Sequence, residues 1–126
     1  MFVKGKTTRA IGQETESLAC RYLQAQGLRL LERNFSMPQG EIDLIMQEGQ
    51  SLVFIEVRYR RNNNFGSGAE TITRNKQRKL LATAARYLQR NPLRAEQPAR
   101  FDVVSIQMEN NQPLINWIKN AFMASV

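Results

Sequence analysis

Apolar residues recur at helical spacing in two stretches of the chain. In residues 9–26 they repeat every three or four positions, and Gly27 follows as a stop, since glycine readily adopts the left-handed conformation that ends helices. Residues 73–90 carry a second stripe of this kind. The positions of that stripe are Leu80, Leu81, Ala84 and Leu88. The pattern predicts two amphipathic helices that pack against a core.

Shorter apolar runs, separated by turn residues, fill the rest of the chain. Pro and Gly in residues 36–40, and Gly49 further on, predict turns between strands. The predicted strands are residues 28–35, 41–47, 51–59 and 100–108, with 113–122 as a last strand followed by a short helix. The order α-β-β-β-α-β predicts an α/β fold in which helices flank a mixed sheet.

Acidic residues interrupt the two most apolar strands. Because side chains alternate along a strand, one face of residues 41–47 carries Glu41 and Asp43. The opposite face carries Ile42, Leu44 and Met46. In residues 51–59, Glu56 lies on the same face as Arg58. Acids at such positions need a physical reason, because the neighbouring side chains indicate burial.

The turn between these strands sets which residues meet. A two-residue turn at 49–50 pairs residues whose numbers add up to 99, and a slip of one residue would turn one strand's apolar side chains to the wrong face. Asp43 then faces Glu56, and Glu41 faces Arg58. Two carboxylates that face each other across a ladder repel, so a compensating positive charge is expected.

Two kinds of compensation fit the pattern equally well. A hard divalent cation such as Mg²⁺ prefers carboxylate oxygens, and the acids could hold it. Alternatively, Arg58, Arg60 or Lys76 could neutralise the acids in ion pairs. Glu14 and Glu16 flank the apolar stripe of the first helix, and spacing leaves open which of them reaches the sheet. In residues 100–108, Asp102 shares its strand with Arg100, and we expect a structural ion pair there.

Composition narrows the chemistry. The 126 residues fit a single domain, residues 1–126, and no apolar run reaches the ~20 residues that span a bilayer, so a cytoplasmic protein without a membrane partner is expected. The chain has no histidine, which excludes His-based bases and His metal ligands. Its one cysteine, Cys20, lies beside the apolar stripe of the first helix and is expected to pack there.

The positive charge is concentrated in one segment. The net charge is +7, yet residues 58–100 hold 11 Lys or Arg and 2 Asp or Glu, a balance of +9. The remainder holds 7 Lys or Arg and 9 Asp or Glu, a balance of −2. Such an excess favours a polyanionic partner, with nucleic acid ahead of anionic lipid. The alternative is a basic face that contacts only solvent.

The acidic strands also carry a family resemblance. The chain contains Gly40-Glu-Ile-Asp-Leu-Ile45, Val53-Phe-Ile-Glu-Val-Arg58, Phe65-Gly66 and then a basic helix. Further matches are Gly12-Gln-Glu-Thr-Glu16, Tyr22-Leu23, Arg100-Phe-Asp-Val-Val104 and Trp117-Ile118. Together these residues, over nearly the whole chain, resemble the YraN family of bacterial proteins. That family is similar to the restriction-endonuclease-like superfamily, whose signature is PD-(D/E)-X-K, and the resemblance implies its three-layer core.

The resemblance assigns roles to single residues. Asp43 matches the first acid of the signature, Glu56 the second, and Glu16 the glutamate of the first helix. It implies that these three acids hold Mg²⁺, with Mn²⁺ as a substitute, for hydrolysis of a phosphodiester bond. The chain departs from the signature at Arg58, where a lysine is usual, and arginine stays protonated and cannot act as a base. Arg58 and Lys76 are therefore both candidates for contact with the scissile phosphate.

These observations predict a nucleic-acid-binding protein with an endonuclease-like site. The expected partner is DNA ahead of RNA, either branched or damaged, bound mainly through its phosphates. Further candidate phosphate contacts are Arg60, Arg61, Arg74, Arg78 and Lys79. A homodimer is expected if the substrate is a junction. The rival interpretations are a nucleic-acid-binding module without catalysis, which the Arg58 departure favours, and an adaptor for an acidic protein.

Overall fold

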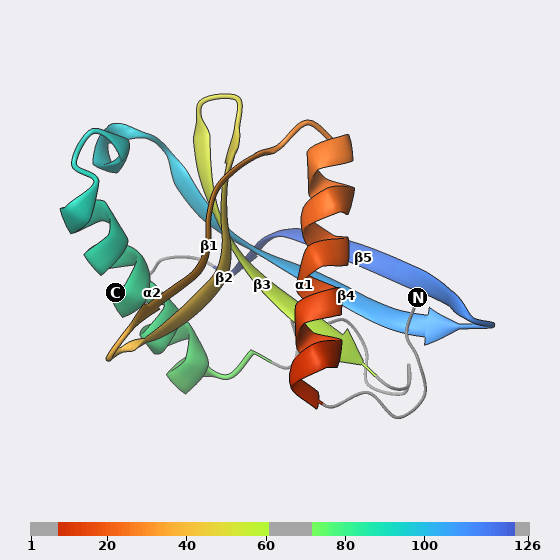
Figure 1. Cartoon of the computed structure of the whole chain (residues 1–126). Helices are drawn as coiled ribbons and strands as arrows, with labels where there is room; N and C mark the ends of the chain where they lie inside the picture. Colours follow the sequence, from red (N-terminus) through yellow and green to blue (C-terminus); the bar gives the residue numbers. More distant parts are fainter. Residues whose placement is uncertain (1–7, 61–71, 123–126) are drawn as a thin grey trace.

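The computed structural model describes residues 8–60 and 72–122, which form two long helices and five strands (Figure 1). The elements are α1 (Thr8–Ala25), β1 (Arg29–Met37), β2 (Gly40–Glu48), β3 (Ser51–Arg60), α2 (Arg74–Arg90), the short 3-10 helix η2 (Arg94–Glu96), β4 (Ala99–Glu109) and β5 (Gln112–Phe122). No helix in the described ranges is long and apolar enough to cross a membrane.

The two helices begin and end near the positions that their local signals predict. α1 ends at Ala25, and Gly27 follows with a φ of 102°, a conformation that is easy only for glycine. At the start of α2, the side chain of Thr73 caps the helix by accepting a hydrogen bond from the Lys76 N–H at 3.1 Å. Capping and stop signals act over a few residues, which is why the sequence locates both helices closely.

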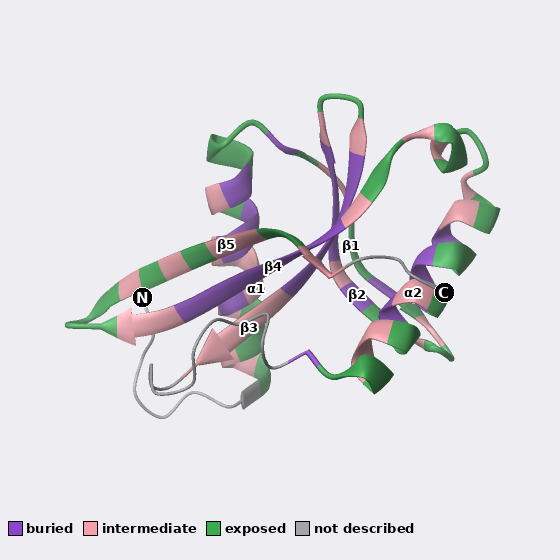
Figure 2. Ribbon diagram, turned by 180° about the vertical axis from the view of Figure 1, so that it is seen from behind, coloured by how far each residue is buried: buried purple, intermediate pink, exposed green. Residues whose placement is uncertain are grey.

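The strands form one mixed sheet in the order β1-β2-β3-β4-β5. Neighbours pair antiparallel except β3 and β4, which run parallel. Parallel neighbours need a crossover connection, and α2 lies within that connection. The central strands β3 and β4 are largely buried, whereas β5 at the edge is partly exposed (Figure 2).

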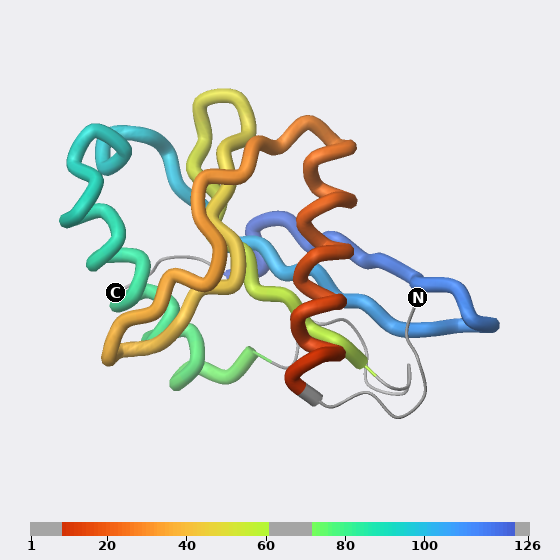
Figure 3. The backbone as a smooth tube through the Cα atoms, viewed as in Figure 1, coloured from red at the N-terminus to blue at the C-terminus, as the bar shows by residue number. Residues whose placement is uncertain are grey.

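Each face of the sheet is covered by one helix, so the fold has the expected three layers (Figure 3). On one face, α1 packs through Ala19 and Leu23 against Leu44 and Ile55. On the other face, the side chains of α2 pack against aromatic residues of the sheet. Those aromatic residues include Phe35, Phe54 and Phe101. The predicted α/β architecture is confirmed.

Two details of the strands differ from the prediction. Ile42 lies in the core beneath α2, whereas Leu44 and Met46 lie in the core beneath α1, so the regular alternation breaks at Asp43. In addition, residues 112–122 form the continuous strand β5, and the short helix expected after a last strand is wrong for the described residues. Antiparallel pairing with β4 explains the second difference, because it extends almost to the end of that segment.

Candidate functional site

The hairpin of β2 and β3 has the predicted register. Met46 pairs with Val53, and Leu44 pairs with Ile55, so the paired numbers add up to 99. The ladder ends at Leu44 and Ile55, however. The expectation that Asp43 and Glu56 face each other as ladder partners is therefore wrong in its detail.

Beyond the end of the ladder, a side chain replaces a backbone partner. Asp43 Oδ2 accepts a hydrogen bond from the backbone N–H of Val57 at 2.8 Å. Glu41 and Arg58 also lie beyond the end of the ladder between β2 and β3, so their predicted pairing is wrong too. Glu41 pairs instead with Ser36 of β1, and Arg58 pairs with Ser105 of β4. The two strands no longer pair with each other at this point, while each stays paired with its other neighbour.

The separation still brings the two predicted acids into contact. Asp43 and Glu56 are hydrogen-bonded through their carboxyl groups, and we call these two residues the carboxyl pair. Burial and then the charge of Glu56 raise the pKa of Asp43 to about 8, although the hydrogen bond from the Val57 N–H lowers it. At neutral pH the carboxyl pair therefore holds a proton, which the two carboxyl groups share in their hydrogen bond.

Two cations approach the charged member of the carboxyl pair. Glu56 is buried, with 7% of its surface exposed. Its Oε2 lies 3.3 Å from Lys76 Nζ and 3.7 Å from the nearer Arg58 terminal nitrogen. Lys76 reaches this position from the first turn of α2, and Arg58 reaches it from β3. Both residues that the sequence offered for contact with a phosphate therefore lie at the pair.

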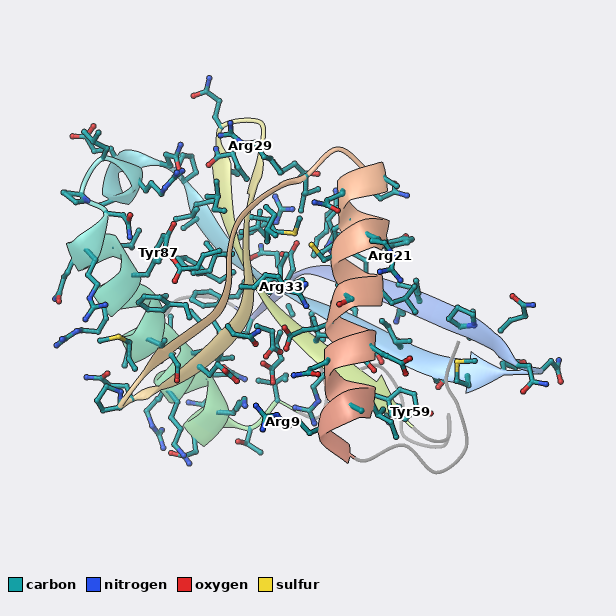
Figure 4. All side chains as sticks on the ribbon, viewed as in Figure 1. Arg9, Arg21, Arg29, Arg33, Tyr59 and Tyr87 are labelled. Atoms are coloured by element: carbon teal, nitrogen blue, oxygen red, sulfur yellow. The ribbon has the colours of Figure 1, made fainter. Side chains whose placement is uncertain are left out.

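Glu16 lies near the carboxyl pair but turns toward another partner. Its Oε1 is 3.5 Å from an Arg33 terminal nitrogen, and Arg33 lies between α1 and the sheet (Figure 4). Burial raises the pKa of Glu16, while Arg33 and Asn34 oppose the rise. Within residues 8–60 and 72–122, no three acidic side chains gather closely enough to hold one metal ion. Glu16 is nevertheless near enough for its charge to raise the pKa of Asp43.

The other predicted phosphate contacts within the described residues lie on α2 and at the end of β3. Arg74, Arg78 and Lys79 are exposed on α2. Arg60 is half-buried at the end of β3. Arg61 lies outside the described residues.

The carboxyl pair has the donor chemistry that Mg²⁺ prefers. Mg²⁺ takes oxygen ligands and is often bound by one or two carboxylates, with water and substrate phosphate completing its shell. Asp43 and Glu56 supply such oxygens from side chains that are in contact. The residues present therefore fit the ion through two carboxylates, while the third, Glu16, contacts Arg33.

The predicted ion pair of Arg100 and Asp102 is confirmed and is part of a larger network. Asp102 is almost fully buried and accepts hydrogen bonds from Arg100, from Trp117 Nε1 at 2.9 Å and from the Asn120 N–H at 2.9 Å. Arg100 also contacts Glu48 Oε1 at 2.7 Å. The spacing of Arg100 and Asp102 revealed the first contact, but nothing in the pattern pointed to the other partners.

The residues that sequence reasoning missed at the site are partners of the acids. Arg33 and Asn34, which interact with Glu16, come from β1. The Val57 N–H, which binds Asp43, is a backbone group. A side-chain pattern carries no signal for a backbone donor, and Arg33 looks like any exposed strand arginine.

Comparison with known proteins places the chain in a family. The profile of the family described as Uncharacterised protein family UPF0102 matches residues 15–106. A UPF0102 protein of Nitrosococcus oceani is 51% identical over 120 residues, which cover 95% of this chain and 97% of the relative. A UPF0102 protein of Vibrio campbellii is 51% identical over 114 residues, covering 90% of this chain and 92% of the relative.

Among solved structures, Pyrococcus furiosus SfsA in complex with Ca²⁺ resembles the chain distantly. The TM-score is 0.36 with 14% sequence identity, over 89% of this chain and 63% of that one. This likeness is too weak to carry an argument. The family match and the close relatives are sufficient, and this protein belongs to the UPF0102 family, the YraN proteins.

Proposed function

We propose that this protein binds DNA and hydrolyses a phosphodiester bond at the carboxyl pair with the help of a divalent cation. The observation that carries the proposal is the contact of Asp43 with Glu56, flanked by Lys76 and Arg58. Carboxylates beside cations at one end of a sheet match the needs of phosphoryl chemistry, in which oxygen ligands hold a metal and cations receive the phosphate.

Each residue of the site has a role that its position supports. Asp43 and Glu56 would hold Mg²⁺, which supplies Lewis-acid polarisation of a phosphate oxygen. Asp43 must first lose its proton, and the Val57 N–H keeps its carboxylate oriented. Glu16 becomes a third ligand if it leaves Arg33.

The two cations differ in what they offer. Arg58 presents a planar set of donors to phosphate oxygens and keeps its charge at any relevant pH. Lys76 lies closer to Glu56 and, at the start of a capped helix, can take the place of the usual signature lysine. Both are now paired with Glu56, and a bound metal ion would free them to contact the phosphate.

The basic segment, residues 58–100, indicates what kind of partner the protein binds. The basic segment favours a polyanion, and we place DNA ahead of RNA. If the substrate is a junction, a homodimer would supply one site for each strand that is cut.

A cleavage assay tests the proposal. Linear, nicked, flapped and four-way DNA are incubated with Mg²⁺ or Mn²⁺ and either the wild-type protein or the Asp43→Asn variant, which keeps the shape of the side chain. The expected result is cleavage of at least one substrate by the wild type and loss of cleavage to background in the variant, with DNA binding retained. Arg21→Gln, an exposed substitution on α1, is the control and should cut normally.

Three outcomes would overturn the proposal. Cleavage that survives Asp43→Asn would show that the activity comes from a contaminant. DNA binding without any cleavage, equal with and without Mg²⁺, would instead favour a binding module that lacks catalysis. The pairing of Arg58 with Glu56 in the position of the usual lysine is the observation that favours this second candidate. Failure to bind any DNA would favour an adaptor for an acidic protein.

A further inference from the structure

The outward face of α2 carries positive charge without any acidic residue. The helix has six basic residues and no acidic ones in its 17 residues. Five of the six are exposed, namely Arg74, Arg78, Lys79, Arg86 and Arg90. Across the described parts of the chain, none of these five forms an ion pair.

This pattern differs from that of a helix that only faces solvent. Such helices usually place acids and bases four residues apart, because each opposite pair stabilises the helix by roughly 0.2–0.5 kcal/mol. In α2 the pairs Arg74–Arg78 and Arg86–Arg90 have that spacing with like charges, which destabilises the helix by a similar amount. α1, in contrast, mixes Glu14 and Glu16 with its arginines. A polyanionic partner would neutralise the like charges along α2, so their arrangement favours a binding surface for a polyanion.

The basic face begins at the carboxyl pair and runs away from it. Lys76, in the first turn, contacts Glu56, and the helix then continues along the β1 and β2 side of the sheet (Figure 1). With a rise of about 1.5 Å per residue, the last turn at Arg90 lies roughly 21 Å along the axis from Lys76. One DNA strand has a phosphate about every 3.4 Å of helix axis, so this length matches roughly six base pairs.

The form of this face suits a duplex better than a single strand. Proteins that bind single strands combine basic grooves with exposed aromatic side chains on which bases stack. The one aromatic residue of α2, Tyr87, is buried against Phe35 and Phe54. A helix that exposes basic side chains and no aromatic one can contact the phosphates of a rigid duplex but offers no ring on which a base could stack.

We infer that the outward face of α2 binds the phosphates of a duplex arm that extends about six base pairs from the carboxyl pair, with Arg86 and Arg90 at the far end. The inference rests on the proposed function and adds the class of substrate, a site flanked by continuous duplex on the α2 side. Neither arginine belongs to the residues that the sequence analysis assigned to nucleic acid.

The test measures how duplex affinity depends on salt. A labelled 20-bp duplex and a single strand of equal length are titrated with the wild-type protein and the double variant Arg86→Gln/Arg90→Gln over a series of KCl concentrations. Two lost phosphate contacts should reduce the slope of log K against log salt by about 1.8 on the duplex. On the single strand the same double variant should reduce this slope much less.

A matched control removes the same charge elsewhere. Arg21→Gln/Arg29→Gln changes two exposed arginines on α1 and β1, which lie away from α2 (Figure 4). It should leave the duplex slope within about 0.5 of the wild-type value. Circular dichroism of all variants confirms that α2 is intact.

The outcomes separate this inference from the proposed function. If the wild type binds duplex and the two double variants behave alike, the α2 face is not the binding surface and only this inference fails. If Arg86→Gln/Arg90→Gln reduced the salt slope on the single strand as much as on the duplex, the assignment to a duplex would be overturned. If the wild type binds neither probe at any salt concentration, the proposed function fails as well.

Discussion

At the scale of residues, the candidate site is defined by a carboxyl group that is hard to ionise. Asp43 lies where its two strands separate, and burial beside Glu56 keeps it protonated near neutral pH. Lys76 and Arg58 offset the charge of Glu56 but contact only that member of the pair. A divalent cation bound to both carboxyl groups would favour the ionised form of Asp43, which the two side-chain cations at Glu56 leave protonated.

Replacing Asp43 by asparagine should stabilise the protein at alkaline pH. An unfolded aspartate has a pKa near 3.9, whereas the folded pKa is about 8, so between these values the folded state binds the extra proton. The free energy of unfolding then falls as pH rises from about 4 to about 8. An amide has no proton to lose and can still accept from the Val57 N–H.

Thermal unfolding of the wild type and Asp43→Asn between pH 4 and pH 9 measures this effect. The variant should melt higher by roughly 5 °C or more at pH 8, with a difference that shrinks toward zero at pH 4. A difference that is equal at all pH values would mean that the two carboxyl groups do not share a proton.

At the scale of elements, α2 connects the site to the basic surface. Its buried side packs on β2, its first turn places Lys76 at Glu56, and its outer side carries the exposed arginines. Thr73 determines where the helix starts, because its side chain binds the Lys76 N–H. A small polar residue at one helix end thus positions a cation of the site.

Removal of this cap should weaken the protein measurably. We expect Thr73→Ala to lower the free energy of unfolding by about 1 kcal/mol, since the Lys76 N–H loses its side-chain acceptor. Urea denaturation provides the measurement, and Gln89→Ala on the exposed side of the same helix serves as the control with little change. Equal midpoints for the two variants would argue against the cap.

The elements also show what a sequence can predict. Helix ends and the hairpin register were predictable because they follow from glycine, threonine and alternation over a few neighbouring residues. The side on which Ile42 packs was not, because it depends on where β2 stops pairing with β3. Similarly, the approach of Lys76 to Glu56 depends on how the crossover docks α2, which no local pattern encodes.

At the scale of the whole molecule, a buried network holds together strands that the sheet order brings side by side. Asp102 in β4 binds Trp117 and the Asn120 N–H in β5, and Arg100 extends the network to Glu48 at the end of β2. Lys119 completes the network by packing 4.4 Å from the centre of the Trp117 ring. The contacts of this network join β2, β4 and β5 and serve the fold, although Asp102 pairs with Ile55, the residue before Glu56.

Loss of the Asp102 charge should therefore lower the stability of the protein. Asp102→Asn leaves Arg100 with one fewer charged partner inside the network, and breaking such buried pairs costs about 3 kcal/mol or more. Glu109→Gln, on the exposed end of β4, removes an equal charge and should change the unfolding free energy by less than about 0.5 kcal/mol. Similar losses in both variants, measured in urea, would contradict this role.

The early end of the β2–β3 ladder has a consequence for the order in which the molecule assembles. Asp43 and Glu56 belong to one hairpin and come together as soon as that short loop closes, whereas Lys76 arrives only when the later helix docks. For an interval during folding, the two acids are neighbours without the ammonium group that later stabilises them. A pH low enough to protonate one of the two carboxyl groups would remove that early repulsion, so we expect the hairpin to close more easily below about pH 4 than in alkali.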